Sequence, residues 1–163
     1  MTAGLVVMAY GTPATPADIE AYYTHIRRGR APEPDQLAQL TARYDAIGGT
    51  SPLAERTEAQ RRALQTALGK GWLVVLGQKH AAPFIEDAVQ QLAEAGVDRL
   101  VGLVLAPHYS RASVGEYQAR LRAAAEEHRL PVEAIDEWYL EPTYVNFLAE
   151  AVRDALIEMP ERT

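Results

Sequence analysis

The residues best able to do chemistry lie in the first third of the chain. Three arginines, Arg27, Arg28 and Arg30, fall within four positions of a sequence whose net charge is −6. A guanidinium presents a planar fork of N–H donors, which suits a carboxylate or a phosphate. Cationic side chains also favour the C-terminal ends of helices, where they oppose the helix dipole. The cluster therefore permits a structural as well as a binding interpretation.

A second candidate site lies at a glycine-rich turn. Arg43 and Tyr44 precede residues 47–52, which read IGGTSP and open a new helix. The backbone amides at such a helix start can receive an anion. As a phosphate loop the turn is weak, because it lacks the lysine of a P-loop and does not directly follow a strand. The simplest interpretation of Ser51 is a helix N-cap.

Three further candidates follow predicted strands. Tyr10 ends the first apolar run, and His80 and His108 come shortly after the second and third runs. Ligands of open α/β sheets bind beyond the carboxyl ends of strands, so this is a favourable place for chemistry. The two histidines can bind metal or transfer protons, but each can equally be a structural hydrogen-bonding group. His25 is predicted as polar surface of a helix, and Tyr117 as a buried or partly buried residue.

Strands that alternate with helices must position these residues. The alternation implies βαβ crossovers, and hence an α/β fold with a four-stranded parallel sheet flanked by helices. Residues 11–71, between the first two strands, carry an extra helical insertion, which is typical of a binding surface. Apolar runs predict strands at 5–10, 72–78, 99–106 and 132–135. Helices are predicted near 15–26, 34–47, 51–69, 83–96, 112–128 and 142–159.

Composition limits the class of protein. A chain of 163 residues with 48% hydrophobic residues is expected to form one domain over 1–163. The absence of cysteine excludes disulfides, thiolate catalysis and cysteine-ligated metal, and agrees with a cytoplasmic location. The acidic net charge argues against nucleic-acid binding, and no apolar stretch reaches the roughly 20 residues of a membrane helix. No GxSxG, HExxH or GxGxxG motif supports a hydrolase, zincin or dinucleotide-binding interpretation.

Several long motifs carry a resemblance that covers essentially the whole chain. In order they read GLVVMAYGTP, DIEAYYTHIRRGR, RYDAIGGTSPLAERTEAQ, KHAAPFIEDAV, VLAPHYS and EWYLEPTYV. This series closely resembles the amino-terminal half of ferrochelatases, most strongly the coproporphyrin type of Gram-positive bacteria. The resemblance implies one Rossmann-like chelatase lobe of an enzyme of haem biosynthesis. Ferrous iron and porphyrin are its implied substrates, and it implies no cofactor.

The resemblance also implies roles for particular residues. Tyr10 would lie on the proximal side of the porphyrin and ligate the iron of the product. Coproporphyrin is a flat apolar ring with four carboxylates, so aromatic walls with forked cations at the edge suit it. The implied porphyrin contacts are Tyr10, Arg27, Arg43, Tyr44, Ser51 and Tyr117.

The chain departs from the family in length. Ferrochelatases carry a second lobe, which holds the histidine and glutamate credited with metal insertion, and neither His80 nor His108 aligns with that histidine. We therefore expect a porphyrin-binding lobe, favoured as a truncation, that needs the missing lobe or a second subunit for full activity. No certain catalytic residue is assigned. The alternatives are a non-catalytic haem-binding module with Tyr10 as ligand, and a homodimeric single-lobe chelatase that uses His80 or His108.

Overall fold

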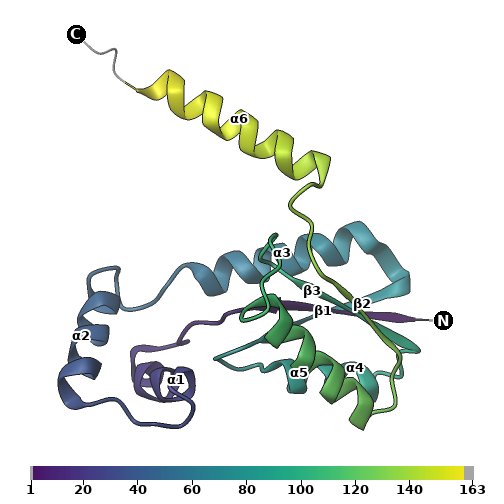
Figure 1. Ribbon diagram of the computed structural model, residues 1–163, viewed down its shortest axis with the longest axis horizontal. Coiled ribbons are helices and arrows are strands. Elements are labelled where there is room, and N and C mark those ends of the chain that lie inside the picture. Colours follow the sequence, from purple (N-terminus) through teal and green to yellow (C-terminus); the bar gives the residue numbers. More distant parts are fainter. Residues whose placement is uncertain (1, 160–163) are drawn as a thin grey trace.

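A four-stranded parallel sheet forms the centre of the computed structural model, which describes residues 2–159 (Figure 1). The strand order is β2-β1-β3-β4, so β1 is paired on both edges. Opposite Ala3 of β1 stand Trp72 on one side and Arg99 on the other. The strands are β1 (Ala3–Ala9), β2 (Trp72–Gln78), β3 (Arg99–Val104) and β4 (Val132–Ile135).

Helices alternate with the strands, which confirms the predicted α/β fold. Three of them lie between β1 and β2, where the sequence predicts an insertion. Short 3-10 turns precede α1 and β2, at Pro16–Asp18 and Gly69–Gly71. The helices are α1 (Ile19–Ile26), α2 (Pro34–Asp45), α3 (Leu53–Leu68), α4 (Ile85–Glu94), α5 (Val114–Glu127) and α6 (Pro142–Glu158).

Two strands end earlier than the sequence predicts. β1 ends at Ala9 rather than at Tyr10, because the chain turns at Gly11, where φ is 91°. β3 ends at Val104, and the chain then leaves the sheet towards Pro107, whose carbonyl accepts the N–H of Trp138 at 3.0 Å. Tyr10 is therefore the first residue beyond its strand, not the last residue within it.

The sheet is covered on both faces, with α3 above it and α4 and α5 below it in the view of Figure 1. Side chains of β1 alternate between the two layers: Val6 packs in the cluster with α4 and α5, and Val7 in the cluster with Leu64 of α3. This double burial explains why β1 reads as an unbroken apolar run. The apolar positions of α4 that meet the sheet are Ile85, Ala88, Val89 and Leu92, each at most 1% exposed.

Gly77 lies where β2 touches the start of α4. A β-carbon here would come within 3.0 Å of both Ile85 Cα and Val6 Cγ1. Because a helix backbone cannot shift without disturbing the core, we expect Gly77→Ala to lower the free energy of unfolding by about 1–3 kcal/mol, as overpacking does. Urea unfolding followed by circular dichroism measures this change. Gly71→Ala is the control, since nothing lies within 4 Å of its β-carbon; equal losses in both variants would refute the packing argument.

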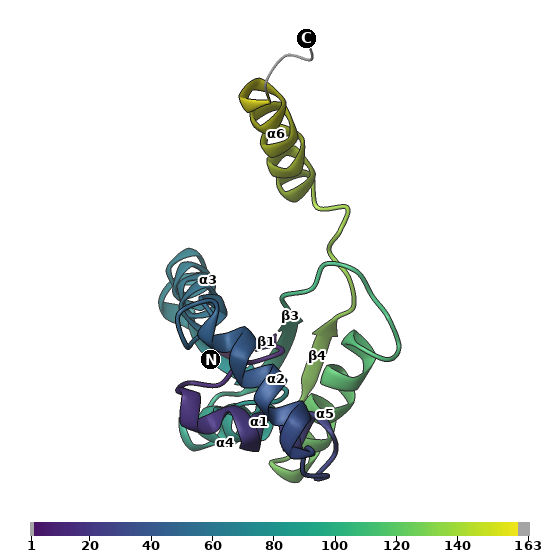
Figure 2. The ribbon, with the colours of Figure 1, turned by 90° about the vertical axis from the view of Figure 1, so that its left-hand side faces the viewer.

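The helix α6 stands apart from the sheet and its other helices (Figures 1 and 2). Its side chains Phe147, Val152 and Ile157 are 63%, 60% and 81% exposed. In the part of the chain that the structure describes, no helix combines the length and apolar character needed to span a membrane. The assignment of residues 1–163 to a single domain stays a prediction.

Candidate functional site

The carboxyl ends of β1 and β2 meet at one edge of the sheet. Just beyond the strands, the N–H of Lys79 donates to the Ala9 carbonyl at 2.9 Å, and the N–H of His80 donates to the Tyr10 carbonyl at 3.0 Å. These two bonds hold the Tyr10 and His80 rings side by side, with centroids 4.6 Å apart. Tyr10 is 45% exposed, so its ring can meet a ligand at this edge.

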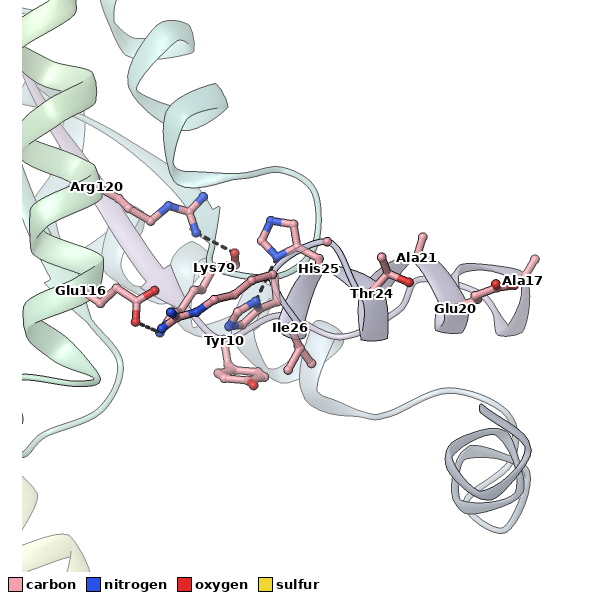
Figure 3. A pocket seen from close by; sticks show the side chains of 13 residues that line it. Tyr10, Ala17, Glu20, Ala21, Thr24, His25, Ile26, Lys79, Glu116 and Arg120 are labelled. Carbon is pink, nitrogen blue, oxygen red and sulfur yellow. Dashed lines mark hydrogen bonds and ion pairs between the residues drawn. The ribbon is translucent and has the colours of Figure 1, made fainter. Parts of the chain in front are cut away.

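Tyr10 and His80 line a cavity of about 910 Å³, and residues of α1 and α5 form most of the rest of its wall (Figure 3). Apolar positions of α1, such as Ala21 and Ile26, form part of its wall. The remainder is strongly polar. Its charged lining residues are Glu20, Arg28, Lys79, Glu116 and Arg120.

Two ion pairs hold α5 in place beside this large cavity, one to Lys79 of the cavity lining and one to Glu86 of α4. The Lys79 ammonium lies 2.7 Å from Glu116, and the Arg120 guanidinium lies 2.6 Å from Glu86. Arg120 also donates to the Lys79 carbonyl at 2.7 Å (Figure 3). The hydrogen bond from Lys79 lowers the pKa of Glu116. The charges of Lys79, Glu116 and Arg120 are thus paired, and these contacts fix the segment after β2 to α5.

His25 lies next to His80 in the lining of the large cavity. The two Nδ1 atoms lie 3.0 Å apart, and the His25 ring stacks on Phe84 with centroids 5.2 Å apart. The predicted exposure of His25 is correct, but its description as plain polar surface is incomplete, because these contacts join residues 55 positions apart. Burial, followed by the charge of Lys79 and the neighbouring His25, lowers the pKa of His80 to about 4.

A second cavity, of about 460 Å³, lies between α1 and α2 and shares Tyr10 with the first. The Tyr44 hydroxyl lies 3.2 Å from Thr12 Oγ1, and the Tyr22 hydroxyl donates to the Gly11 carbonyl at 3.2 Å. Burial, with the neighbouring Tyr44, raises the pKa of Tyr22. Three predicted site residues, Tyr10, Arg43 and Tyr44, therefore line one aromatic cavity, together with Tyr22 and Tyr23.

Two of the predicted contacts, Arg27 and Ser51, lie outside both cavities. The Arg27 guanidinium lies 5.5 Å from the Tyr23 ring centroid, and its Nε–H donates to the Arg30 carbonyl at 3.3 Å. The N-cap of α3 is Pro52 rather than Ser51, and Ser51 Oγ, one residue earlier, accepts the N–H of Leu53 at 3.2 Å. Ligand binding by either residue stays a prediction.

Tyr117 and His108 also lie outside these two cavities. Tyr117 is buried in α5, 4% exposed, with the Lys79 ammonium 5.2 Å from its ring centroid. Burial, with the nearby Tyr10 and Glu116, raises the pKa of Tyr117 to about 12. His108 stacks on Tyr139, with ring centroids 5.2 Å apart. The expected burial of Tyr117 is confirmed, whereas its contact with a ligand stays a prediction.

Sequence reasoning overlooks several side chains of the site. A signal exists for Lys79, which directly follows the second predicted strand, and for Glu116 and Arg120, which lie four positions apart on the next-to-last helix. Tyr22 reads only as a core position of α1. Nothing in the spacing shows that Lys79 pairs with Glu116, because that pair joins different elements.

The site lies at the carboxyl edge of the parallel sheet and combines several tyrosine side chains with the guanidinium of Arg43. This arrangement defines a lobe that can hold a flat ligand bearing anionic groups. Residues 2–163 match the family model described as Ferrochelatase. The chain therefore belongs to the ferrochelatase family.

Curated bacterial relatives are similar to this chain over nearly all of its length. A coproporphyrin III ferrochelatase of Geobacillus kaustophilus is 50% identical over 167 aligned positions, covering 99% of this chain and 53% of the relative. Proteins of the same name from Oceanobacillus iheyensis and Bacillus subtilis are 45% and 46% identical, covering 97% of this chain and 52% and 53% of themselves. The chain thus spans about half the length of the curated relatives it matches.

Proposed function

We propose that this chain is the porphyrin-binding first lobe of a ferrochelatase that inserts ferrous iron into coproporphyrin III in haem biosynthesis. The observation that carries the proposal is the meeting of Tyr10, Arg43 and Tyr44 at one cavity. Aromatic side chains suit the apolar ring, and a guanidinium suits the carboxylates at its edge. The name shared by the curated relatives supports coproporphyrin III as the substrate.

Tyr10 would contact the proximal face of the ring and ligate iron in the product. Burial, with smaller effects of Glu116 and Tyr44, raises the pKa of Tyr10. Without a bound metal, the Tyr10 side chain is therefore a neutral phenol. A bound iron ion lowers the pKa of a coordinating group, so the phenol would lose its proton when its oxygen coordinates the metal.

The other proposed contacts hold the porphyrin at its edge. Arg43 would present its N–H fork to a carboxylate, and the Tyr44 hydroxyl can donate in the same cavity. Arg27, Ser51 and Tyr117 would each have to exchange a present contact for one to the ligand. Arg27 is the simplest case, since it follows Ile26, which lines both cavities.

Metal insertion exchanges two pyrrole protons for one ferrous ion. The resemblance assigns the groups that take these protons to the second lobe of the family, so we propose that turnover needs that lobe or a second subunit. Iron and porphyrin are substrates in this scheme, and no cofactor is required. The cytoplasmic location expected from the cysteine-free composition stays a prediction.

Anaerobic incubation of the chain with ferrous iron and coproporphyrin III tests this function. We expect the porphyrin absorption bands to shift on binding, without conversion to the spectrum of the iron complex above the rate in buffer. The full-length Bacillus subtilis relative serves as the positive control. Absence of any porphyrin binding would overturn the proposed function.

Turnover by the lone chain would instead overturn the need for a second lobe. Size-exclusion chromatography under the assay conditions then separates the two remaining explanations. An active dimer would identify a homodimeric single-lobe chelatase, and an active monomer would show that one lobe suffices. Binding without turnover, even after a complementary second lobe is added, would favour a haem-binding module.

A further inference from the structure

Two histidines that line the large cavity are not among the proposed porphyrin contacts. His25 comes from the last turn of α1, and His80 follows the end of β2. Their Nδ1 atoms lie 3.0 Å apart, within hydrogen-bond distance, in the lining of the cavity. In the metal-free state one ring must donate its N–H to the other, because a neutral imidazole has one donor and one acceptor nitrogen.

We propose that His25 and His80 form a two-histidine chelate for a divalent transition-metal ion. With metal–nitrogen bonds of about 2.1 Å, two nitrogens 3.0 Å apart subtend an angle of about 90° at the metal. This is the angle between neighbouring ligands of an octahedral ion. Imidazole nitrogen suits iron, cobalt, nickel and zinc, so the chelate selects this class of ion over magnesium or calcium.

Neighbouring rings hold the two histidines in this arrangement. The His25 ring stacks on Phe84 at an interplanar angle of 24°, and the His80 ring packs beside Tyr10 with centroids 4.6 Å apart. The backbone of His80 is also tied to the Tyr10 carbonyl at 3.0 Å. The His25 and His80 centroids lie 5.2 Å apart, so the two nitrogens now point at each other and each ring must turn to aim its nitrogen at the ion. Because the two rings are already adjacent and packed, this turn costs less conformational freedom than assembly of a chelate from separate side chains.

Water completes the coordination of the ion. Within residues 2–159, no three side chains of His, Asp or Glu gather closely enough to hold a metal ion on their own. The carboxylate of Glu20 adds negative charge to the same cavity, and the positive charge of Lys79 beside His80 is offset by its ion pair with Glu116. Binding shifts the donor ring to its Nε2–H tautomer, so the two neutral imidazoles need not release a proton.

The chelate lies beside Tyr10 but requires no porphyrin. An ion with two protein ligands and several waters exchanges readily, so the site suits transient holding of a metal ion rather than its storage. A metal ion at this place would raise the local concentration of ions next to the proposed porphyrin site. The inference goes beyond the proposed function, and it stands or fails independently of it.

Cobalt(II) titration of the tag-free chain, without porphyrin, tests the chelate by calorimetry and by visible absorption of the bound ion. We expect saturable one-to-one binding, with nickel(II) tighter than cobalt(II), as the usual affinity order requires. Even loss of a partner outside the coordination sphere weakens metal binding about 10–100-fold, so removal of a direct ligand should cost at least about tenfold. His25→Ala and His80→Ala should therefore each weaken binding to this extent.

The two remaining histidines provide matched controls. His108→Ala and His128→Ala should leave the cobalt(II) affinity within about twofold, since these residues lie outside the chelate. His25 is exposed, so His25→Ala should fold normally and decides the test even if His80→Ala is unstable. Unchanged affinity in His25→Ala, or no saturable binding by the unaltered chain, would overturn the proposal. Neither result would touch the porphyrin titration, which judges the proposed function separately.

Discussion

Replacing Tyr10 by phenylalanine is expected to abolish the tyrosinate charge-transfer band of the complex between the chain and iron(III) coproporphyrin III. The variant keeps the aromatic ring at the edge of the sheet but removes the only atom that can coordinate iron. We expect the affinity for iron coproporphyrin to fall at least about tenfold, equivalent to about 1.4 kcal/mol. Affinity for the metal-free porphyrin, which gains nothing from the phenol oxygen as a ligand, should change less than about threefold. Absorption and fluorescence titrations measure the two affinities.

Tyr109→Phe provides the matched control. Tyr109 is 46% exposed, almost the same as the 45% of Tyr10, but it lines neither of the two cavities. This variant should retain the band and both affinities. A tyrosinate band that survives in Tyr10→Phe would remove Tyr10 from the coordination sphere, whatever the porphyrin affinity.

Replacing Arg43 by glutamine should weaken the binding of coproporphyrin III itself. Hydrogen bonds to a charged partner contribute about 1.5–3 kcal/mol, so loss of the guanidinium should raise the Kd about ten- to hundredfold. Arg43→Lys should recover only part of this loss, because an ammonium lacks the planar fork that matches a carboxylate. Fluorescence titration of the porphyrin provides the three affinities.

The salt dependence of binding separates a carboxylate contact from a change of shape. If Arg43 pairs with a carboxylate, added salt should weaken binding by the unaltered chain more than by Arg43→Gln, because salt screens the pair. Arg62→Gln on α3 removes an exposed arginine that lies outside both cavities and should behave like the unaltered chain. Equal porphyrin affinities for Arg43→Gln and Arg62→Gln would exclude Arg43 from the site.

The sequence is a good guide to elements whose pattern is local. β1 is apolar at every position because both faces are covered, and α4 repeats its apolar residues at helical spacing. Gly48 and Gly49, with φ of 94° and 90°, end the helical region as predicted. The Ser51 contact at the start of α3 is equally local, since its partner is the N–H of Leu53 two residues ahead. Such elements and contacts can be predicted from residue type and spacing alone, because their partners lie close by in the sequence.

Contacts between distant segments are where sequence reasoning fails. His25 reads as surface because its partner His80 belongs to another element, and the pairing of Lys79 with Glu116 is hidden for the same reason. Arg27 and Arg28 look equivalent in sequence, yet Arg28 lines the large cavity while Arg27 lies near the Tyr23 ring. The turn at the end of α1, where Arg28 has a φ of 57°, determines which of the two side chains lines the cavity. The sequence does not show this backbone conformation.

The central place of β1 also affects the order in which the chain folds. Its first residue, Ala3, pairs with Trp72, so roughly 70 further residues must leave the ribosome before this pairing can form. Their synthesis takes roughly 3–14 seconds at usual rates. During that interval the most apolar strand has no neighbour on either edge. Contacts of such long sequence separation slow folding and favour aggregation. Expression at lower temperature or with chaperones should therefore raise the soluble yield of this chain.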